Sequence, residues 1–234
     1  MSLPFFYIDD YDGSGSITLN EETSKHIIQV LRMKAGEMIR LTDGNGQLLE
    51  CGITGDHRKY CTVTVKKNTY QEPRGKKISI AISLLKNASR FEWFLEKVTE
   101  LGVSEIIPLL CSRTEKEKFR FDRMQGICIS AMLQSQQCWL PTLREPTPFE
   151  NWDSWKLANA NNYIAHCMDD AKQPLNSLPT GTFSNFQIAI GPEGDFTKEE
   201  VALALQNGFT AVSLGDTRLR TETAGVAAAV MLTL

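Results

Sequence analysis

The chain has 234 residues, of which 42% are hydrophobic and 23% are charged, as is usual for a globular protein of one large domain or two small ones. Its formal net charge of −3, taken alone, argues against a nucleic-acid partner, because such partners usually meet a basic protein. No segment approaches the ~18 consecutive apolar residues of a membrane span, and the first residues lack the basic and apolar regions of a secretory signal. The composition therefore indicates a cytoplasmic protein without membrane contact.

The charge is unevenly distributed along the sequence. Residues 1–75 carry a net charge of −1, residues 76–125 a net charge of +3, and residues 126–234 a net charge of −5. In the basic segment, Arg113 and Arg120 lie among other basic residues, acidic residues and two phenylalanines. Basic residues interleaved with aromatic ones can bind an RNA backbone and stack on its bases. From this run alone, a solvated loop of mixed charge is the simpler interpretation.

The six cysteines and three histidines show no metal-binding pattern. Neighbouring cysteines are at least 10 residues apart and none forms a C-x-x-C pair, which argues against a zinc ribbon or a thioredoxin-like site. The histidines His26, His57 and His166 are scattered. We therefore expect reduced thiols and no metal site.

Residues 1–72 are rich in short apolar or alternating runs separated by turn signals, which predicts a small β-barrel. The runs that predict strands are residues 17–19, 38–41, 48–53 and 61–65. One helix interrupts them, with Asn20 as its N-cap and Ile27, Val30 and Leu31 on one face. A polar stretch with Pro and Gly at residues 71–75 is typical of a linker.

Residues 73–234 alternate between strand and helix patterns, which predicts a parallel α/β sheet. The expected strands are residues 78–85, 106–110, 163–167, 186–190 and 212–214, with helices near residues 91–101, 122–138, 197–207 and 221–234. The first strand is apolar almost throughout, as in a sheet covered on both faces. Pro108 indicates an irregular or edge position. The last helix is apolar nearly all round, which favours deep burial or a subunit interface.

Two loops follow the late strands and combine glycines with charged residues. They span residues 190–196 and 214–224. In open α/β sheets ligands bind at the carboxyl ends of strands, and glycines let the backbone approach a ligand closely. Neither a G-x-G-x-x-G nor a G-x-x-x-x-G-K-[ST] motif is present. A tight turn with Glu193 near a helix N-terminus, and a structural pair of Arg220 with Glu222, are the simpler alternatives.

The sequences IGPEGDFTKEEV (190–201) and LGDTRLRTETA (214–224) resemble the paired C-terminal signatures of the RsmE-type 16S ribosomal RNA methyltransferases. The resemblance extends upstream to Lys86, Arg90 and residues 99–103, and to residues 26–32 near the start of the chain. It covers nearly the whole chain, with the motifs in the expected order.

The resemblance implies an N-terminal PUA-like β-barrel that binds RNA, residues 1–72, and a SPOUT α/β domain with a C-terminal trefoil knot, residues 73–234. It implies a homodimer formed through the SPOUT domain. The cofactor would be S-adenosylmethionine, and the reaction would be methylation of N3 of a uridine in the 16S ribosomal RNA of the small subunit.

The resemblance also implies roles for individual residues. The expected cofactor-binding residues are Ile190, Gly191, Pro192, Glu193, Gly194, Leu214, Gly215, Leu219, Arg220 and Thr221. Arg220 is expected to stabilise the uridine anion, with Glu193 or Glu222 as a general base or as a partner that orients Arg220. The expected phosphate contacts are Arg32, Lys86, Arg90, Arg113 and Arg120. The target base must be unpaired or flipped out.

This chain departs from the family pattern at several positions. Asp195 replaces a glycine, Thr217 replaces an arginine next to Arg218, and Leu133 and Gln137 replace a common Glu and Arg. These changes bear mainly on which side chains reach the RNA.

Two other functions are alternatives to the methyltransferase. One is a non-catalytic RNA-binding or ribosome-assembly factor. The other is a small-molecule nucleotide enzyme, which the missing phosphate loops disfavour.

Overall fold

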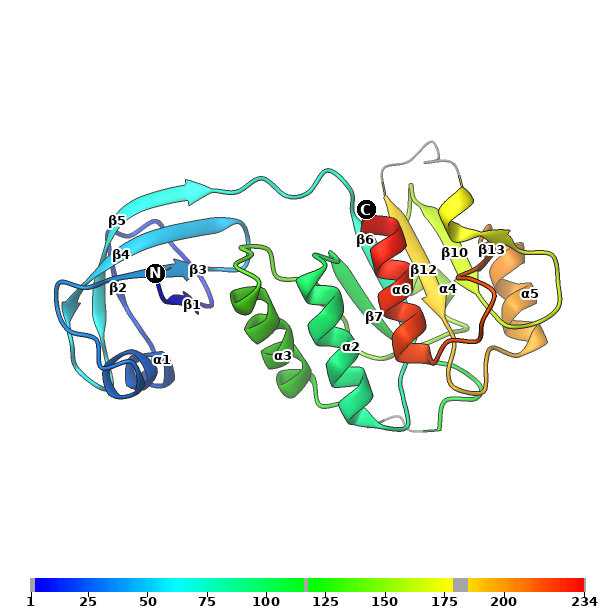
Figure 1. Ribbon diagram of the computed structural model, residues 1–234, viewed down its shortest axis with the longest axis horizontal. Coiled ribbons are helices and arrows are strands. Elements are labelled where there is room, and N and C mark those ends of the chain that lie inside the picture. Colours follow the sequence, from blue (N-terminus) through cyan, green and yellow to red (C-terminus); the bar gives the residue numbers. More distant parts are fainter. Residues whose placement is uncertain (1–2, 116–117, 179–184, 234) are drawn as a thin grey trace. The chain divides into compact units, whose positions relative to one another are not determined.

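The computed structural model describes residues 3–115, 118–178 and 185–233 (Figure 1). The chain divides into two compact units. The first consists of Met1–Pro73 together with Met132–Leu140, and the second of Arg74–Ala131 together with Pro141–Leu234. Within the described ranges, no helix is long and apolar enough to cross a membrane.

The first unit is built on a five-stranded sheet. In sheet order its strands are β1 (Phe5–Tyr7), β3 (Met38–Thr42), β4 (Gln47–Gly55), β5 (Thr62–Tyr70) and β2 (Ser16–Thr18). The β1–β3 pair is parallel and the other pairs are antiparallel. Its core is a cluster of buried aliphatic side chains that includes Ile39, Leu41 and Leu49. The four strands predicted in this part of the chain are confirmed, and β1 was not predicted.

The helix of the first unit begins as the sequence predicts but does not continue as expected. Asn20 caps α1 (Glu21–Lys25) by accepting a hydrogen bond from the Thr23 N–H at 2.8 Å. The chain then forms a π-helical turn, η1 (His26–Val30), closed by Leu31 N–H donating to His26 O. The wider turn adds a residue per hydrogen-bonded ring. As a result Ile27 is buried while Val30 is 68% exposed and Leu31 43%, so the prediction of one shared apolar face is wrong.

A distant piece of chain completes the first unit. Helix α3 (Phe121–Gln134) ends four residues earlier than predicted, and Gln136 has a φ of +58°. The chain that follows binds the turn between β3 and β4 through Gly46 N–H to Cys138 O at 2.8 Å and Leu140 N–H to Gly44 O at 2.9 Å. The Trp139 indole N–H also donates to Gln71 O. These bonds explain why residues 132–140 group with the first unit.

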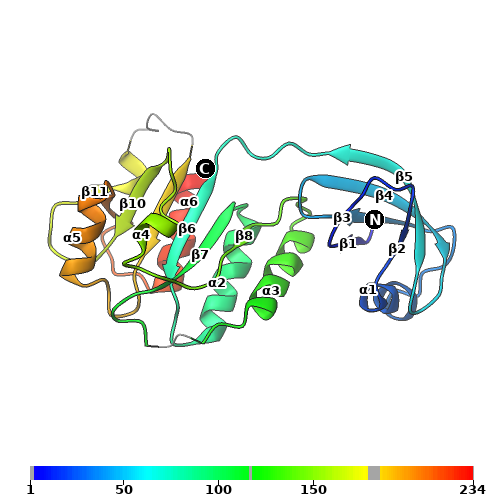
Figure 2. The same ribbon diagram turned by 180° about the vertical axis from the view of Figure 1, so that it is seen from behind.

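The second unit contains a fully parallel sheet. In sheet order its strands are β11 (Gln173–Pro174), β13 (Thr210–Ser213), β10 (Asn161–Ala165), β12 (Phe186–Ile190), β6 (Ile78–Ser83), β7 (Glu105–Leu110) and β8 (Thr142–Leu143), with β9 (Thr147–Pro148) also paired to β7. Figure 2 shows β6, β7 and β8 side by side. The predicted parallel sheet of five strands is confirmed, and the three short strands at its edges were not predicted.

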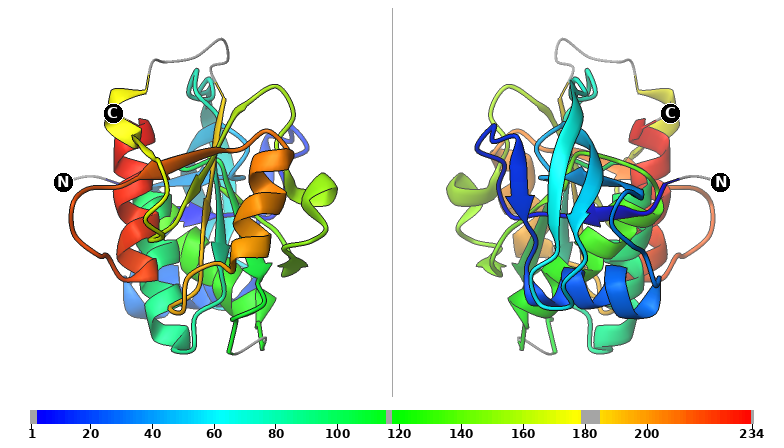
Figure 3. Two further views of the ribbon diagram at one scale, coloured as in Figure 1. Left: turned by 90° about the vertical axis from the view of Figure 1, so that its right-hand side faces the viewer. Right: turned by 90° about the vertical axis from the view of Figure 1, so that its left-hand side faces the viewer.

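Helices cover both faces of this sheet, as the apolar strand sequences predict. The helices are α2 (Ala88–Glu100), α4 (Trp152–Trp155), α5 (Lys198–Gln206) and α6 (Thr221–Thr233), with a short 3-10 turn η2 (Leu175–Ser177). In the left view of Figure 3, α2 and α6 lie on one side of the sheet and α5 on the other. On the α4 and α5 side, Ala81, Ile107 and Ala189 pack with Trp155 and Val201 in one buried cluster.

Pro108 has a strand neighbour on one side only, as the sequence predicts for an irregular or edge position. It is paired with Ile82 of β6. On the other side of β7, β8 pairs only with Glu105 and Ile106, and β9 with Leu109 and Leu110. Even-numbered residues of β7 face that side, as shown by Arg144 N–H donating to Ile106 O. The missing N–H of Pro108 therefore coincides with the gap between β8 and β9.

Local signals end and start the helices of this unit as predicted. Thr197 and Glu200 form a capping box at the start of α5. Gly102 has a φ of +77°, which ends α2 at little steric cost. Helix α6 lies against α2 at Gly225, where an added Cβ would be 2.5 Å from the Phe94 ring and 3.0 Å from Ile82. Glycine is needed there because the helices approach too closely for a methyl group.

Two glycine-to-alanine substitutions in helices should have opposite effects. Gly225→Ala should lower the free energy of unfolding by about 1–3 kcal/mol, because the methyl group would overpack the contact with Phe94. Gly126→Ala in α3 is the matched control. An added Cβ there has no atom within 4 Å, so the higher helix propensity of alanine should raise stability by about 0.5–1 kcal/mol. Urea denaturation of both variants checks this, and equal effects would contradict the proposed close packing.

Candidate cofactor and acceptor site

Three neighbouring strands end beside one hollow of about 740 Å³, within the size range of small-molecule sites. The strands are β13, β10 and β12, which are adjacent in the sheet. Because all are parallel, their carboxyl ends and the loops that follow lie at the same edge. We call this the first hollow; its walls are residues 165–167, 190–195 and 212–221 together with Arg90, Lys172 and Ala224.

All ten residues that sequence reasoning assigned to the cofactor line the first hollow. They are residues 190–194, Leu214, Gly215 and residues 219–221. The departures Asp195 and Thr217 also line it, as does Arg218. Leu133 and Gln137 lie in the other unit, where the Gln137 side chain donates to Ser135 Oγ at 2.8 Å.

Hydrogen bonds hold the loop after β12 in shape. Asp195 has a φ of +64°, a conformation that a glycine adopts more easily. Its carboxylate accepts the N–H groups of Phe196 and Cys167, each at 2.9 Å. The bond to Cys167 ties the loop after β12 to the loop after β10. Asp195 therefore supplies a link between two walls of the hollow that a glycine at this position cannot make.

Arg113 fixes the same loop from outside. Its guanidinium donates to Gly194 O at 2.6 Å and to Phe196 O at 3.4 Å. Arg113, expected as a phosphate contact, thus has a structural task in binding backbone carbonyl groups.

A small residue is needed at Gly191 in this loop, since an added Cβ would lie 3.1 Å from Phe196 N and 3.0 Å from its ring.

Glu193 and Lys86 lie at the exposed rim. The Glu193 carboxylate accepts the Lys86 backbone N–H at 3.2 Å. The Lys86 ammonium pairs with Glu115 at 2.6 Å, and this hydrogen bond raises the pKa of Lys86. Both side chains are exposed, so Glu193 presents its carboxylate at the opening of the hollow.

Glu222 is placed differently from Glu193. It does not line the first hollow but a second one of about 510 Å³, whose walls are Arg90, Trp93, residues 218–220, Glu222 and Thr223. Glu222 is only 7% exposed, and its Oε1 lies 3.7 Å from Arg90 Nε. Arg220 lines both hollows. The buried carboxylate of Glu222, which lines only the second hollow, pairs with Arg90.

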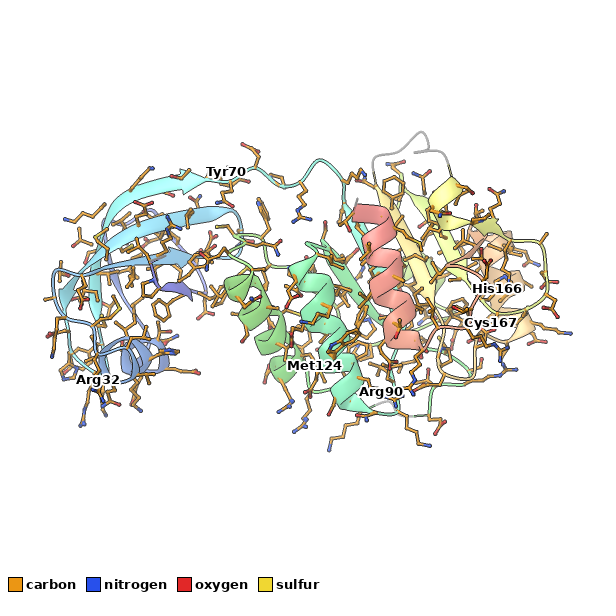
Figure 4. The ribbon with its side chains drawn as sticks, in the orientation of Figure 1. Arg32, Tyr70, Arg90, Met124, His166 and Cys167 are labelled. Carbon is orange, nitrogen blue, oxygen red and sulfur yellow. The ribbon has the colours of Figure 1, made fainter. Side chains whose placement is uncertain are left out.

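The remaining predicted RNA contacts belong to different elements of the two units. Arg90, at the N-terminal end of α2, lines both hollows (Figure 4). Arg120 is exposed and precedes α3. Arg32 is exposed in the first unit, two residues after the end of η1, with a φ of +57°.

Sequence reasoning missed the wall formed by the loop after β10. This wall includes His166 and Cys167, labelled in Figure 4. His166 is 6% exposed, and neither ring nitrogen has a hydrogen-bond partner among the described residues. Burial lowers its pKa, the Lys172 ammonium lowers it further, and Asp195 and Asp170 oppose the shift. The buried ring is therefore neutral near pH 7 and offers a donor and an acceptor.

The described residues contain no cluster of three His, Cys, Asp or Glu side chains suited to a metal ion. The polar groups at the hollow include backbone amides, guanidinium groups, carboxylates, hydroxyls, the Lys172 ammonium and one imidazole. Such a set can bind an uncharged heterocycle, hydroxyl groups and both charged ends of an amino acid.

Comparison with known proteins identifies the class and then the family. A family model described as RNA methyltransferase domain matches residues 72–233, and one described as RNA methyltransferase PUA domain matches residues 19–66. An RNA methyltransferase domain joined to a PUA domain is thus the class that the fold and the matches define. Relatives specify it further.

The Synechocystis ribosomal RNA small subunit methyltransferase E is 30% identical over 222 residues, 89% of this chain and 70% of that protein. A probable rRNA-methyltransferase from Porphyromonas gingivalis has a crystal structure with a TM-score of 0.90, 37% identity and coverage of 97% of this chain and 96% of that chain. The methyltransferase E from Neisseria gonorrhoeae, bound to S-adenosyl methionine, gives a TM-score of 0.87 and 27% identity, covering 98% and 96%. This chain belongs to the ribosomal RNA small subunit methyltransferase E family.

The buried His166 should make stability depend on pH. Because its pKa in the folded chain is lowered, the unfolded chain takes up the proton first as the pH falls below the ordinary value of about 6.5. The free energy of unfolding should therefore fall as the pH drops from about 6.5 through the lowered pKa of the folded state. Thermal denaturation between pH 8 and pH 5 should show a smaller decrease in Tm for His166→Gln than for wild type. Equal decreases would contradict a neutral buried His166.

Proposed function

We propose that this protein transfers the methyl group of S-adenosylmethionine to N3 of a uridine in the 16S ribosomal RNA of the small subunit, in the cytoplasm. The observation that carries the proposal is that the two signature loops, residues 190–196 and 214–224, meet in one hollow at the carboxyl ends of adjacent parallel strands. The family supports the reaction, since the Neisseria relative is bound to S-adenosyl methionine.

The first hollow has the chemistry that this cofactor needs. Gly215 is exposed and leaves its backbone open to a ligand, while the partly exposed Leu219 offers apolar surface for an adenine ring. His166 offers two ring nitrogens without partners among the described residues. The cofactor supplies an electrophilic methyl group on a sulfonium when bound; the chain supplies binding, orientation and proton transfer.

The acceptor must lose its N3 proton, and the negative charge that develops on the uracil must be stabilised. Arg220 lines both hollows, which supports it as the cation beside the uracil oxygens. Glu193 is exposed at the rim and Glu222 is buried beside Arg90. These two environments support Glu193 or Glu222 as proton acceptor, with the other group orienting a cation.

We also propose the finer fold features that the family resemblance implies. The order β13–β10–β12–β6 takes the chain out to β13 and then back to α6, which packs on α2, β6 and β12. Such a return supports a C-terminal trefoil knot of the SPOUT kind. Between Ala224 and Leu232 helix α6 carries only apolar side chains and Gly225, which supports a homodimer through the SPOUT domain, with residues 1–72 as an RNA-binding barrel and residues 73–234 as the catalytic domain.

Methyl transfer itself tests the proposal. Purified protein, labelled S-adenosylmethionine and undermethylated small subunits should yield N3-methyluridine in 16S RNA, detected by digestion and mass spectrometry. Binding to the subunit without that nucleoside would favour a non-catalytic assembly factor and contradict the proposal.

Arg220→Ala should reduce kcat by about 10²–10³-fold at saturating cofactor, the usual effect of removing a group that stabilises a developing anion. Lys198→Ala is the control, because this exposed cation at the start of α5 lies outside both hollows. Single-turnover transfer rates measure the effect. A kcat for Arg220→Ala within twofold of wild type would exclude Arg220 from the chemical step.

RNA binding should weaken steeply with salt. We propose that Arg32, Lys86, Arg90, Arg113 and Arg120 supply phosphate contacts. Each neutralised phosphate of single-stranded RNA contributes about 0.7 to the slope of log K against log salt concentration. With five such contacts, filter binding between 50 and 300 mM KCl should give a slope of about −3.5. A flat titration would contradict a basic binding surface.

A further inference from the structure

The second hollow shares a wall with the first. Arg90, Arg218, Leu219 and Arg220 line both. A ligand in the second hollow is therefore separated from the first only by these side chains. The two hollows together offer adjoining places for a donor and an acceptor.

An exposed indole forms part of the second hollow. Trp93 is 43% exposed, whereas its helix neighbours Phe91 and Phe94 are only 2% and 0% exposed. The face of α2 that carries Trp93 thus differs from the face that packs in the core. A large aromatic ring left open beside a pocket is a common sign of a ligand that stacks on it.

Charge around this indole favours an anionic ligand. Three guanidinium groups, from Arg90, Arg218 and Arg220, line the second hollow together with one carboxylate, Glu222. Arginine guanidinium groups bind phosphate oxygens and carbonyl oxygens through paired N–H groups. A flat ring beside cations is the arrangement by which proteins bind unpaired nucleotides.

Glu222 gives a second, independent sign of a ligand. Its Oε1 lies near Arg90, but its buried Oε2 has no hydrogen-bond partner among the described residues. A buried carboxylate oxygen without a donor is costly. The N–H of a base in the second hollow is a donor that would satisfy it.

We propose that the second hollow is the subsite for the target nucleotide, with its base stacked on Trp93 and its polar edge held by the arginines and Glu222. The inference rests on the proposed function, and it adds a stacking residue that selects for an unpaired base. Stacking requires a base withdrawn from its helix, so the subsite explains how a paired uridine is rejected.

A binding cycle between protein and RNA tests the subsite. The uridine methylated by wild type is first mapped on 16S RNA, and a fragment is then made with that uridine or with an abasic site in its place. Wild type should bind the uridine fragment about 5- to 100-fold more tightly than the abasic one. Trp93→Ala should bind both alike, and Trp93→Phe should keep most of the preference.

Control measurements separate stacking from structure. Leu205→Ala removes another exposed apolar side chain of the same unit, outside both hollows, and should keep the wild-type preference. Cofactor affinity and molecular mass in solution should be unchanged in Trp93→Ala and Trp93→Phe.

Two results would overturn the inference while leaving the proposed function intact. One is an unchanged uridine-to-abasic ratio in Trp93→Ala. The other is a change of oligomeric mass with that ratio retained, which would place Trp93 in a subunit interface. Absence of N3-methyluridine with wild type would remove the proposed function and the subsite together.

Discussion

The order of strands in the parallel sheet is the constraint on which the rest of the second unit depends. β10 lies between β13 and β12 in the sheet, although β12 and β13 follow one another in the chain. Parallel pairing places the three following loops at one edge, and both signature loops consequently meet in the first hollow. Hydrogen bonds then fix the shape of the site. The bond from Cys167 N–H to the Asp195 carboxylate ties two of these loops together.

The same arrangement links donor and acceptor chemistry. Helix α6 begins directly after the loop at residues 214–220 and packs on α2, which brings Glu222 to Arg90. The close contact at Gly225 and Phe94 lets the two helices approach. Arg220 and Arg90 thus lie where the two hollows adjoin, and in our proposal they act on the acceptor beside the cofactor.

Much of the fold and part of the site were predictable from the sequence. The strand at residues 186–190 and the capping box of α5 carry strong local signals, which the structure confirms. The short strands β8, β9 and β11 carry no strong local signal, because two-residue pairings depend on distant partners. The π-turn at η1 and the pairing of residues 138–140 with the turn at Gly44–Gly46 are equally non-local. His166 was missed because only the strand order brings its loop to the hollow, and Trp93 because its spacing on α2 indicates exposure but not the hollow beside it.

The central claim is that the three strand-end loops form one cofactor site. Isothermal titration calorimetry of the purified protein with S-adenosylmethionine tests it most directly. We predict saturable binding with one site per chain, weakened when Asp195→Ala cuts the link between the loops after β10 and β12. No binding at millimolar cofactor would contradict it.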